Sequence, residues 1–337
     1  MRRARLTAIR KIEIDNFCKE PEITSPNQMI VKVRYAGVNA DDYNVFSGSF
    51  ASPYDDQTLL HEMSGEIVEL GEEAKKEGFA IGDRVSSNVC FGCGVCPMCR
   101  KGKSNLCLDK HGVGVSSDYL LLDTKSAVKL PDNISLKEGC LYWLVATCTR
   151  CVEKLNIQPD ESILILGGGS AGLILLQLLK KRSPSVLAIS EPVDSKRKLA
   201  IKLGADYVIN PNVEHLEEAS LELTNGLGFD VVIDAAGALA ALENITELIA
   251  RGGRLMLFSY YHVEEALRLN LMEMYWKEIN ILSSYGAMDA QYTYSGTRII
   301  EYLDIESIIG EVIPFEKIQE ALEIFGTREK LRLILKY

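Results

Sequence analysis

The chain has 337 residues, of which 47% are hydrophobic and 25% charged, and its formal net charge is −10 at pH 7. The length favours two domains in an ordinary globular protein, and the acidic balance argues against nucleic acid as the main partner, because phosphate binding needs a basic surface. No apolar run approaches the roughly 20 residues of a membrane span, and the basic N-terminus lacks the apolar core of a signal peptide, so we expect no membrane partner and a cytoplasmic location.

Strand-like runs and polar turns alternate in the N-terminal part of the chain. β-rich runs cover residues 6–14 and 29–35, and the alternation in the second predicts a half-buried strand. A polar segment with Asn39, Asp41 and Asp42 follows. Its plain interpretation is a capped turn that begins a short helix, since Asn and Asp are favoured at such positions. The alternative, that these side chains belong to a site, stays open on the residues alone.

A His–Glu pair, His61-Glu62, stands directly before the next apolar run, and residues 81–85 predict a turn and a further strand. A single His is more often an ordinary surface or core residue than a metal ligand. The pair by itself therefore does not choose between a structural and a functional role.

Five of the nine cysteines fall between Cys90 and Cys107. Four of them are spaced C-x₂-C-x₂-C-x₇-C, which brings four thiolates around one point and suits a tetrahedral structural zinc. Four protein ligands leave no position for water, so this zinc would stabilise a lobe at 88–110 and take no part in chemistry. A cluster of free or redox-active thiols is the alternative. The predicted ligands are Cys93, Cys96, Cys99 and Cys107, with Cys90 as a neighbour and not a ligand.

A central segment has the pattern of a dinucleotide-binding unit. The apolar run 163–166 predicts a buried strand, and Gly167, Gly169 and Gly172 follow as G-x-G-x-x-G. An apolar helix comes next, and a second strand ends in Glu191, close to the position expected for an acid that binds the adenosine ribose. Free N–H groups at the helix N-terminus favour a pyrophosphate. An ordinary tight turn with a surface Glu is the alternative.

The cofactor predicted from this unit is NAD. Glu191 would accept hydrogen bonds from both ribose hydroxyls, and its charge would repel the 2′-phosphate of NADP. Residues 190–193 contain no Arg to bind that phosphate. The candidate cofactor-binding residues are Gly167, Gly169, Ser170, Ala171, Gly172, Glu191 and Lys196.

Strands and helices go on alternating after this unit, which predicts a doubly wound parallel sheet. A helix over 138–155 leads into the nucleotide unit. The further predicted elements are helices at 195–203, 240–250 (closed by Gly252 and Gly253) and 315–325, and strands at 204–209, 229–233, 254–258, 279–284 and 331–336.

Together these motifs resemble the medium-chain, zinc-type alcohol and polyol dehydrogenase family, over nearly the whole chain and in the same order. The resemblance implies an α/β protein with a GroES-like, mostly-β catalytic domain at 1–146 and 287–337. A Rossmann domain with a doubly wound parallel sheet, at 147–286, is inserted between these segments. The family also implies homodimers or homotetramers, and a small-molecule substrate in the cleft between the domains.

The resemblance also implies where a catalytic zinc would be held. Zinc-dependent members use a Cys, a His and a Glu or Cys, and the matching positions here are Asn39, His61 and Trp143. Asn and Trp bind zinc poorly or not at all. The pattern Gly-Val-Asn-x-x-Asp-Tyr around Asn39 is instead similar to the zinc-free quinone-reductase branch, so we expect the catalytic zinc to be missing or altered. A rearranged zinc site on His61 and Glu62, with Asp41 or Asp42, is the alternative.

By the same matching, Thr147 packs under the nicotinamide, Asp41 stands at the proton-relay position and Asp42 supports the site. We expect an NAD-dependent oxidoreductase that moves hydride between nicotinamide and a small alcohol, polyol or sugar. Asp41 is the first candidate for the general base. His61, oriented by Glu62, is the second, because a pKa near 6.5 suits neutral pH. A catalytically silent NAD(H)-sensing protein is the alternative from another class. The candidate catalytic residues are Asn39, Asp41, Asp42, His61, Glu62 and Thr147.

Overall fold

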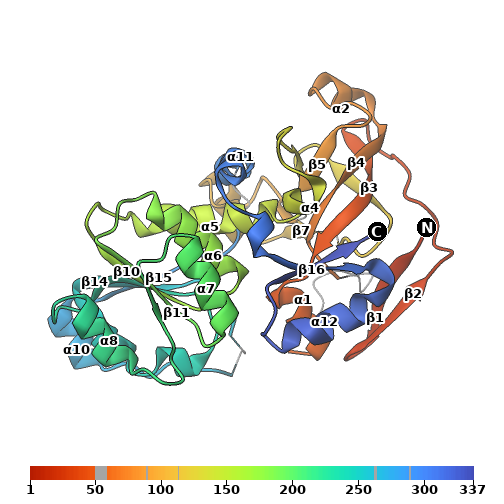
Figure 1. Ribbon diagram of the computed structural model, residues 1–337. Coiled ribbons are helices and arrows are strands. Elements are labelled where there is room, and N and C mark those ends of the chain that lie inside the picture. Colours follow the sequence, from red (N-terminus) through yellow and green to blue (C-terminus); the bar gives the residue numbers. More distant parts are fainter. Residues whose placement is uncertain (50–58, 89, 113, 262–263, 288–289) are drawn as a thin grey trace. The chain divides into compact units, whose positions relative to one another are not determined.

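The protein forms two compact units in a computed structural model that describes residues 1–49, 59–88, 90–112, 114–261, 264–287 and 290–337. Unit 1 comprises Met1–Ala146 and Gly286–Tyr337, and unit 2 comprises Thr147–Tyr285 (Figure 1). Both chain termini belong to unit 1, so unit 2 is an insertion in the chain of unit 1. Within the described ranges, no helix is long and apolar enough to span a membrane.

Unit 1 is built around a mostly antiparallel sheet of seven strands, in the order β16-β17-β3-β4-β5-β9, with β8 also paired to β3. The C-terminal strand β17 pairs antiparallel with β3, which joins the two separated chain segments in one sheet. The strands predicted near 29–35 and 331–336 are confirmed, whereas β16 was not predicted. The strands are β3 (Gln28–Gly37), β4 (Glu62–Leu70), β5 (Arg84–Ser87), β8 (Tyr119–Asp123), β9 (Ala127–Lys129), β16 (Ile309–Pro314) and β17 (Arg332–Lys336).

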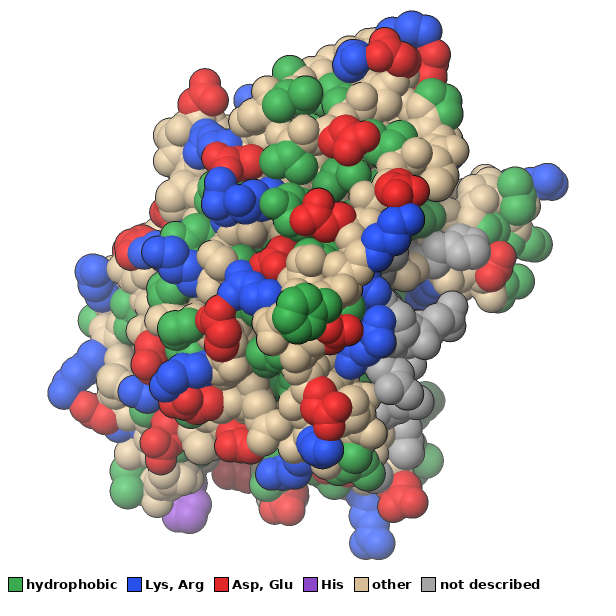
Figure 2. Space-filling model, turned by 90° about the vertical axis from the view of Figure 1, so that its right-hand side faces the viewer, with side chains coloured by type: hydrophobic (Ala, Val, Ile, Leu, Met, Phe, Trp, Pro, Cys, Tyr) green, Lys and Arg blue, Asp and Glu red, His purple; other side chains and the backbone are tan. Residues whose placement is uncertain are grey.

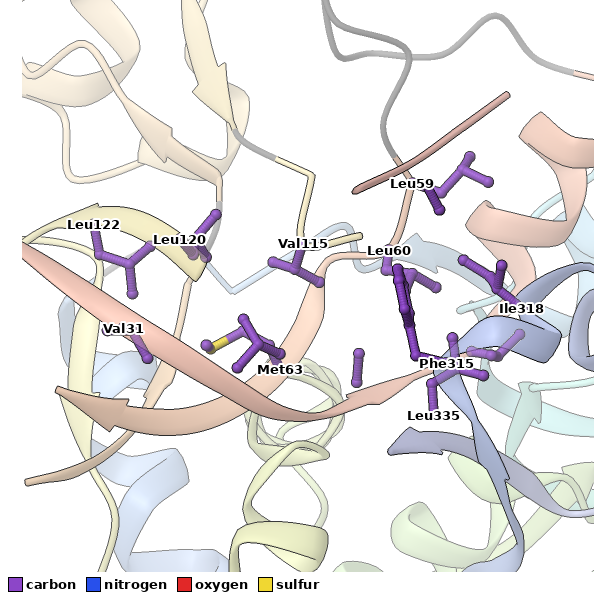
Figure 3. Packing of buried hydrophobic residues seen from close by; sticks show 14 of the residues in the cluster. Val31, Leu59, Leu60, Met63, Val115, Leu120, Leu122, Phe315, Ile318 and Leu335 are labelled. Atoms are coloured by element: carbon purple, nitrogen blue, oxygen red, sulfur yellow. The ribbon is translucent and has the colours of Figure 1, made fainter. Parts of the chain in front are cut away.

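Helices and a hairpin close the core of unit 1. The first predicted β-rich run is a hairpin of two strands, and α1 lies beside α12. Leu59 and Leu60 are fully buried with Met63 and Phe315 in this core, which fixes the backbone that leads into His61 (Figure 3). The elements are β1 (Arg3–Ala8), β2 (Lys11–Asp15), α1 (Ala40–Ser47), α2 (Glu72–Lys76), α4 (Leu136–Gly139), α11 (Ala290–Ile299), η3 (Ile300–Tyr302), η4 (Glu306–Ile308), η5 (Phe315–Lys317) and α12 (Ile318–Gly326).

Unit 2 contains a six-stranded parallel sheet in the order β12-β11-β10-β13-β14-β15. The chain moves outward from β10 in one direction and from β13 in the other, so the predicted doubly wound sheet is confirmed. The elements are α5 (Tyr142–Leu155), which begins in unit 1, β10 (Ser162–Leu166), α6 (Ser170–Lys180), β11 (Val186–Ser190), α7 (Asp194–Lys202), β12 (Tyr207–Ile209), α8 (Leu216–Leu223), β13 (Phe229–Asp234), β14 (Ile249–Leu257), α10 (Leu271–Lys277) and β15 (Asn280–Ser283).

Two helix predictions need correction. The helix predicted over 138–155 is broken between α4 and α5. The helix predicted over 240–250 is wrong, because Asn244 takes a left-handed conformation (φ 52°) and strand β14 already begins at Ile249. Gly252 (φ 77°) lies in an irregular stretch of that strand, where the register against β13 shifts. The segment instead forms the short helices η2 (Leu239–Leu242) and α9 (Ile245–Leu248).

Acidic and basic side chains are interspersed over the surface of the molecule that Figure 2 shows. Neither sign of charge forms a continuous patch on that face. The net charge of −10 is therefore not gathered into one strong local field on that face.

Candidate functional site

The four predicted zinc ligands converge in a small lobe of unit 1. The Sγ atoms of Cys93, Cys96, Cys99 and Cys107 all lie within 4.8 Å of one another, and those of Cys96 and Cys107 are 3.8 Å apart. Zn–S bonds of about 2.3 Å in a tetrahedron require S–S distances of about 3.8 Å, so the set fits zinc. Among the described residues, no other group of three or more metal-binding side chains converges in this way. The lobe contains β6 (Cys90–Gly92), α3 (Pro97–Arg100), η1 (Ser104–Leu106) and β7 (Lys110–Gly112).

Backbone N–H groups prepare these sulfurs to carry negative charge. The N–H groups of Cys93 and Asp109 donate to Sγ of Cys107, and that of Cys96 donates to Sγ of Cys93. Backbone N–H groups, first that of Cys99, lower the pKa of Cys96 to about 6, whereas burial and the neighbouring thiols raise the pKa of Cys99 to about 12. The neighbouring thiols thus oppose a further negative charge at Cys99, and the charge of a bound Zn²⁺ would favour its thiolate form.

Asn39 acts as the N-cap of α1, as the plain interpretation of its segment predicts. Its Oδ1 accepts hydrogen bonds from the backbone N–H groups of Asp41 (2.9 Å) and Asp42 (3.2 Å). In return, Oδ2 of Asp42 accepts from the backbone N–H of Asn39 at 3.1 Å, which completes a capping box. The amide oxygen of Asn39 is therefore engaged in the helix start, and its Nδ2 faces another residue, His61.

His61 lies among the polar side chains at the start of α1. The pairing of β3 with β4 ends with Gly37 opposite Glu62, so the residues that follow β3 lie beside the residue that precedes β4. His61 Nε2 is 3.6 Å from the Asp41 carboxylate and Nδ1 is 3.7 Å from that of Asp42. Nδ2 of Asn39 is almost equidistant from the two ring nitrogens, at 3.4 and 3.3 Å, so it is not directed at either one.

The pKa of His61 in the folded protein differs from the value near 6.5 that was expected from the sequence. Burial lowers its pKa, but the carboxylates of Asp42, Asp41 and Glu62 outweigh burial and raise it to about 9. The imidazole is therefore protonated at neutral pH. It is a proton donor at that pH, and it accepts a proton only under more alkaline conditions.

The backbone directly before His61 is strained. Leu60 has φ 67° although it is not a glycine, and its side chain is fully buried. Its N–H donates to Oδ1 of Asp42 at 3.0 Å, which ties the strained residue to the cap of α1. Such a conformation costs on the order of 1–3 kcal/mol and persists where the surroundings fix it, which is common at functional sites.

Glu62 is paired with an arginine that sequence reasoning missed. Arg332, the first residue of β17, donates from Nη2 to Oε1 of Glu62 at 3.2 Å and from Nη1 to the Val38 carbonyl at 2.6 Å. Both charged side chains are about 95% buried or more. Gly37 is needed beside them, because a Cβ at that position would collide with the Glu62 carboxylate. Burial raises the pKa of Glu62, and Arg332 opposes that shift.

Trp143 and Thr147 lie on α5, in different surroundings. Trp143 packs in an apolar cluster of unit 1 with Val128, Tyr142 and Ala287. Its indole therefore takes part in packing, at the position where the family resemblance implies a third zinc ligand. Thr147 is half-buried and is the first residue of unit 2. Its predicted place beside the nicotinamide remains a prediction.

The glycine turn of unit 2 has the geometry that a dinucleotide needs. Gly167 has φ 100°. Gly172 packs against the carbonyl of Gly167 so closely that a Cβ would collide with it. A Cβ on Gly169, in contrast, would meet no protein atom within 4 Å, so this position is open to a ligand. Ser170 and Ala171 follow as the first two residues of α6, whose N–H groups are free of intrahelical partners. The turn therefore fits a pyrophosphate.

Glu191 is buried and points back to this turn. Its Oε2 accepts from the Gly168 N–H at 2.7 Å, and its Oε1 accepts from the Val193 N–H at 2.8 Å. Arg197, which sequence reasoning missed, donates to the carbonyl oxygens of Glu191 and Pro192, each at 2.7 Å. It also pairs with Asp194 at 3.3 Å. An arginine thus lies near Glu191, although its guanidinium already has three acceptors. Lys196 is buried in the first turn of α7.

Comparison with known families gives matches in both units. The profile of the family described as "Alcohol dehydrogenase GroES-like domain" matches residues 25–132, and that described as "Zinc-binding dehydrogenase" matches residues 171–300. The sequence is 30% identical to a D-arabitol-phosphate dehydrogenase from Enterococcus avium, over 94% of this chain and 91% of that protein. It is 31% identical to a sorbitol dehydrogenase from Halalkalibacterium halodurans, over 81% of each.

A solved structure agrees with these matches in fold. A protein from Sinorhizobium meliloti 1021, bound to NADP, superposes with a TM-score of 0.90 at 23% identity and covers 100% of this chain and 99% of that chain. The fold class expected from the sequence, a GroES-like domain with a Rossmann domain, is confirmed by the two family profiles and by this superposition.

Proposed function

Because this chain belongs to the medium-chain alcohol and polyol dehydrogenase family and is an oxidoreductase of that type, we propose that it is an NAD-dependent enzyme that interconverts a hydroxyl and a carbonyl group without a catalytic zinc at Asn39. Bound nicotinamide would supply or accept the hydride. The observation that carries the proposal is the placement of His61 between the carboxylates of Asp41 and Asp42, beside Asn39. A small polyol or sugar is the proposed substrate, because both named relatives act on compounds of this class.

His61 is the proposed proton carrier. Its imidazolium, which persists up to a pH of about 9, suits donation of a proton to the carbonyl oxygen during reduction. Oxidation of an alcohol requires the neutral imidazole, so this direction should become faster as the pH rises through about 9. Asp41 and Asp42 stabilise the positive charge of the ring, each near one ring nitrogen. The ion pair of Glu62 with Arg332 holds the first residue of β4, which directly follows His61. This assignment reverses the order that the sequence suggested for Asp41 and His61.

NAD is the proposed cofactor rather than NADP. Two backbone N–H groups hold the Glu191 carboxylate beside the glycine turn. A 2′-phosphate would bring a second negative charge next to it, whereas ribose hydroxyls would donate hydrogen bonds to it. Arg197 is a cation near this carboxylate, but it is already bound to two carbonyl oxygens and to Asp194, so we expect it not to favour a phosphate.

A homodimer is proposed from the edge of the unit 2 sheet. Strand β15 is the last strand of that sheet and pairs with β14 on one side. The preceding helix α10 exposes Leu271, Met272, Tyr275 and Trp276, which are 56–76% exposed. Exposed apolar side chains beside an open strand edge favour pairing with a second copy of the chain. A molar mass by light scattering that equals one chain at micromolar concentration would contradict this proposal.

The test of the enzymatic proposal is hydride transfer with a panel of polyols, sugars and their carbonyl forms, followed by the absorbance of reduced nicotinamide. In single turnover, His61→Ala should slow the chemical step by about 10²–10⁴-fold while binding of NADH is unchanged. His215→Ala, an exposed histidine of unit 2, is the matched control and should keep the wild-type rate.

Two outcomes would contradict the proposal. Loss of activity with a chelator, while the four-cysteine zinc stays bound, would show that a second metal is catalytic. Binding of NADH without hydride transfer to any compound of the panel would favour a silent NAD(H)-sensing protein.

A further inference from the structure

A buried carboxylate of unit 2 lies at the same end of the parallel sheet as the glycine turn, where the strands have their carboxyl ends. Asp234 is the last residue of β13 and is fully buried. Leu166, the last residue of β10, is its partner in the parallel pairing of the two strands. The order of the sheet reverses between β10 and β13, and ligands of doubly wound sheets bind at the carboxyl ends of the strands at this point.

Asp234 shapes the turn that leaves this strand. Its Oδ1 accepts hydrogen bonds from the backbone N–H groups of Ala236 (3.1 Å) and Gly237 (3.3 Å), and its Oδ2 accepts from the hydroxyl of Tyr261. Gly237 has φ 60°. A turn with such a glycine has many accessible shapes by itself, so these bonds select one of them.

The same turn touches the glycine turn on one side and the segment after β14 on the other. A Cβ on Gly167 would lie 2.9 Å from the backbone of Ala236. The Ser259 hydroxyl donates to the Asp234 carbonyl at 3.3 Å, and a Cβ on Gly237 would lie 2.8 Å from the Tyr260 carbonyl. Asp234 and Tyr261 thus connect three backbone segments around one end of the sheet.

At this end of the sheet, β10 has a different neighbouring strand on each side. Strand β11 lies on one side and leads to Glu191, the proposed acceptor for the adenosine ribose. Strand β13 lies on the other side. A dinucleotide whose adenosine ribose binds Glu191 and whose pyrophosphate binds at α6 therefore extends its second nucleoside toward residues 235–237.

We propose that Asp234 and Tyr261 are positioning residues that hold residues 235–237 in the shape required by the nicotinamide half of the cofactor. This inference rests on the proposed cofactor function. It assigns a role to a buried acid. Burial of a carboxylate costs free energy of desolvation, and an uncharged side chain at the end of β13 would avoid that cost. Burial raises the pKa of Asp234, while the Tyr261 hydroxyl and the two N–H groups oppose that shift.

The test separates the two halves of the cofactor. Tyr261→Phe removes the hydroxyl and keeps the ring, so the dissociation constant for NADH, measured by fluorescence, should rise about tenfold because Asp234 loses a partner. The dissociation constant for AMP, measured by calorimetry, should stay within about twofold, since AMP carries only the adenosine half. Tyr207→Phe, on the edge strand β12, is the matched control and should change neither constant.

Variants of Asp234 provide a second measurement. Asp234→Asn keeps an oxygen for the two N–H groups and offers an amide to the Tyr261 oxygen, so NADH binding should weaken less than about threefold. Asp234→Ala loses all three bonds and should weaken NADH binding at least as much as Tyr261→Phe.

The possible outcomes are distinguishable. Unchanged NADH binding in Tyr261→Phe, or an equal loss for NADH and AMP, would overturn the positioning role and leave the proposed function intact. A wild-type protein that binds neither nucleotide would overturn the proposed function and this inference with it.

Discussion

The cysteine lobe and the His61 cluster are two polar sites of unit 1 that the chain builds in different ways. Here the His61 cluster means Asn39, Asp41, Asp42, His61, Glu62 and Arg332. The four cysteines of the lobe lie within 15 residues of sequence and converge through short local turns. The cluster instead needs β3, β4 and β17 to be paired, and its Glu62–Arg332 contact joins residues 270 positions apart.

The two sites also differ in how their charge is balanced. The lobe brings four cysteine sulfurs within 4.8 Å of one another, and this set fits a metal ion. The cluster contains its own cations, His61 and Arg332, next to its three carboxylates. The comparison teaches that a distant strand can place a cation beside a buried carboxylate, a contact that spacing along the chain does not reveal.

Removal of one zinc ligand should have the largest effect on stability. Cys96→Ser should lose the zinc and destabilise unit 1 by about 4–5 kcal/mol or more, because binding energy of a structural zinc is folding energy. Elemental analysis and urea unfolding of the purified protein check this expectation. Cys18→Ser, at a cysteine outside the lobe, should keep one zinc per chain and wild-type stability. Full native-state reactivity of all nine thiols in the wild type would contradict a zinc site.

Breaking the buried ion pair of the His61 cluster should cost somewhat less. Arg332→Met leaves the Glu62 carboxylate buried without its cation and should destabilise the protein by about 3–5 kcal/mol. The matched control is Arg34→Met, which breaks the more exposed pair with Glu66 and should cost less than about 1 kcal/mol. Equal effects of the two substitutions in urea unfolding would show that the cluster does not depend on Arg332.

The charge of His61 should appear in the pH dependence of stability. The folded-state pKa of about 9 exceeds the reference value near 6.5, so the stabilisation is fully present below pH 6.5 and is lost as the pH rises through about 9. The difference corresponds to about 3 kcal/mol. His61→Gln should remove this dependence, so the stability difference between wild type and variant should shrink from pH 6 to pH 10. A constant difference across this range would show that His61 is neutral in the folded protein.

Substitution of Glu191 should have the smallest free-energy effect of these changes. Glu191 belongs to a third polar site, the glycine turn of unit 2, and its effect is on the preference between NADH and NADPH. We expect wild type to bind NADH at least tenfold more tightly than NADPH, which corresponds to about 1.4 kcal/mol. Glu191→Gln should reduce that ratio, because the charge that repels the 2′-phosphate is removed. Glu222→Gln, exposed on α8, is the control and should keep the wild-type ratio. Tighter binding of NADPH by the wild type would show that Arg197 outweighs Glu191.

Predictions from the sequence succeeded where one segment carries all the information. The apolar run of β10, the three glycines and the acid Glu191 lie within 30 residues, and β10–α6–β11 forms as expected. The prediction failed at 240–250, where apolar helix-forming residues suggested one helix. There the pairing of Ile249 with Phe229 takes the end of the segment into β14, so tertiary pairing overrides local propensity.

The sequence by itself determined the cysteine spacing, the glycine turn and the strand–helix–strand unit around it, because these depend on distances along the chain and on side-chain periodicity. Only the tertiary structure decided that Asn39 faces His61, that Arg332 compensates Glu62, and that Tyr261 binds Asp234. It also decided the charge of His61, since the three carboxylates that raise its pKa act through space. Electrostatic shifts depend on distance and burial, and neither quantity can be read along a chain before the strands are paired.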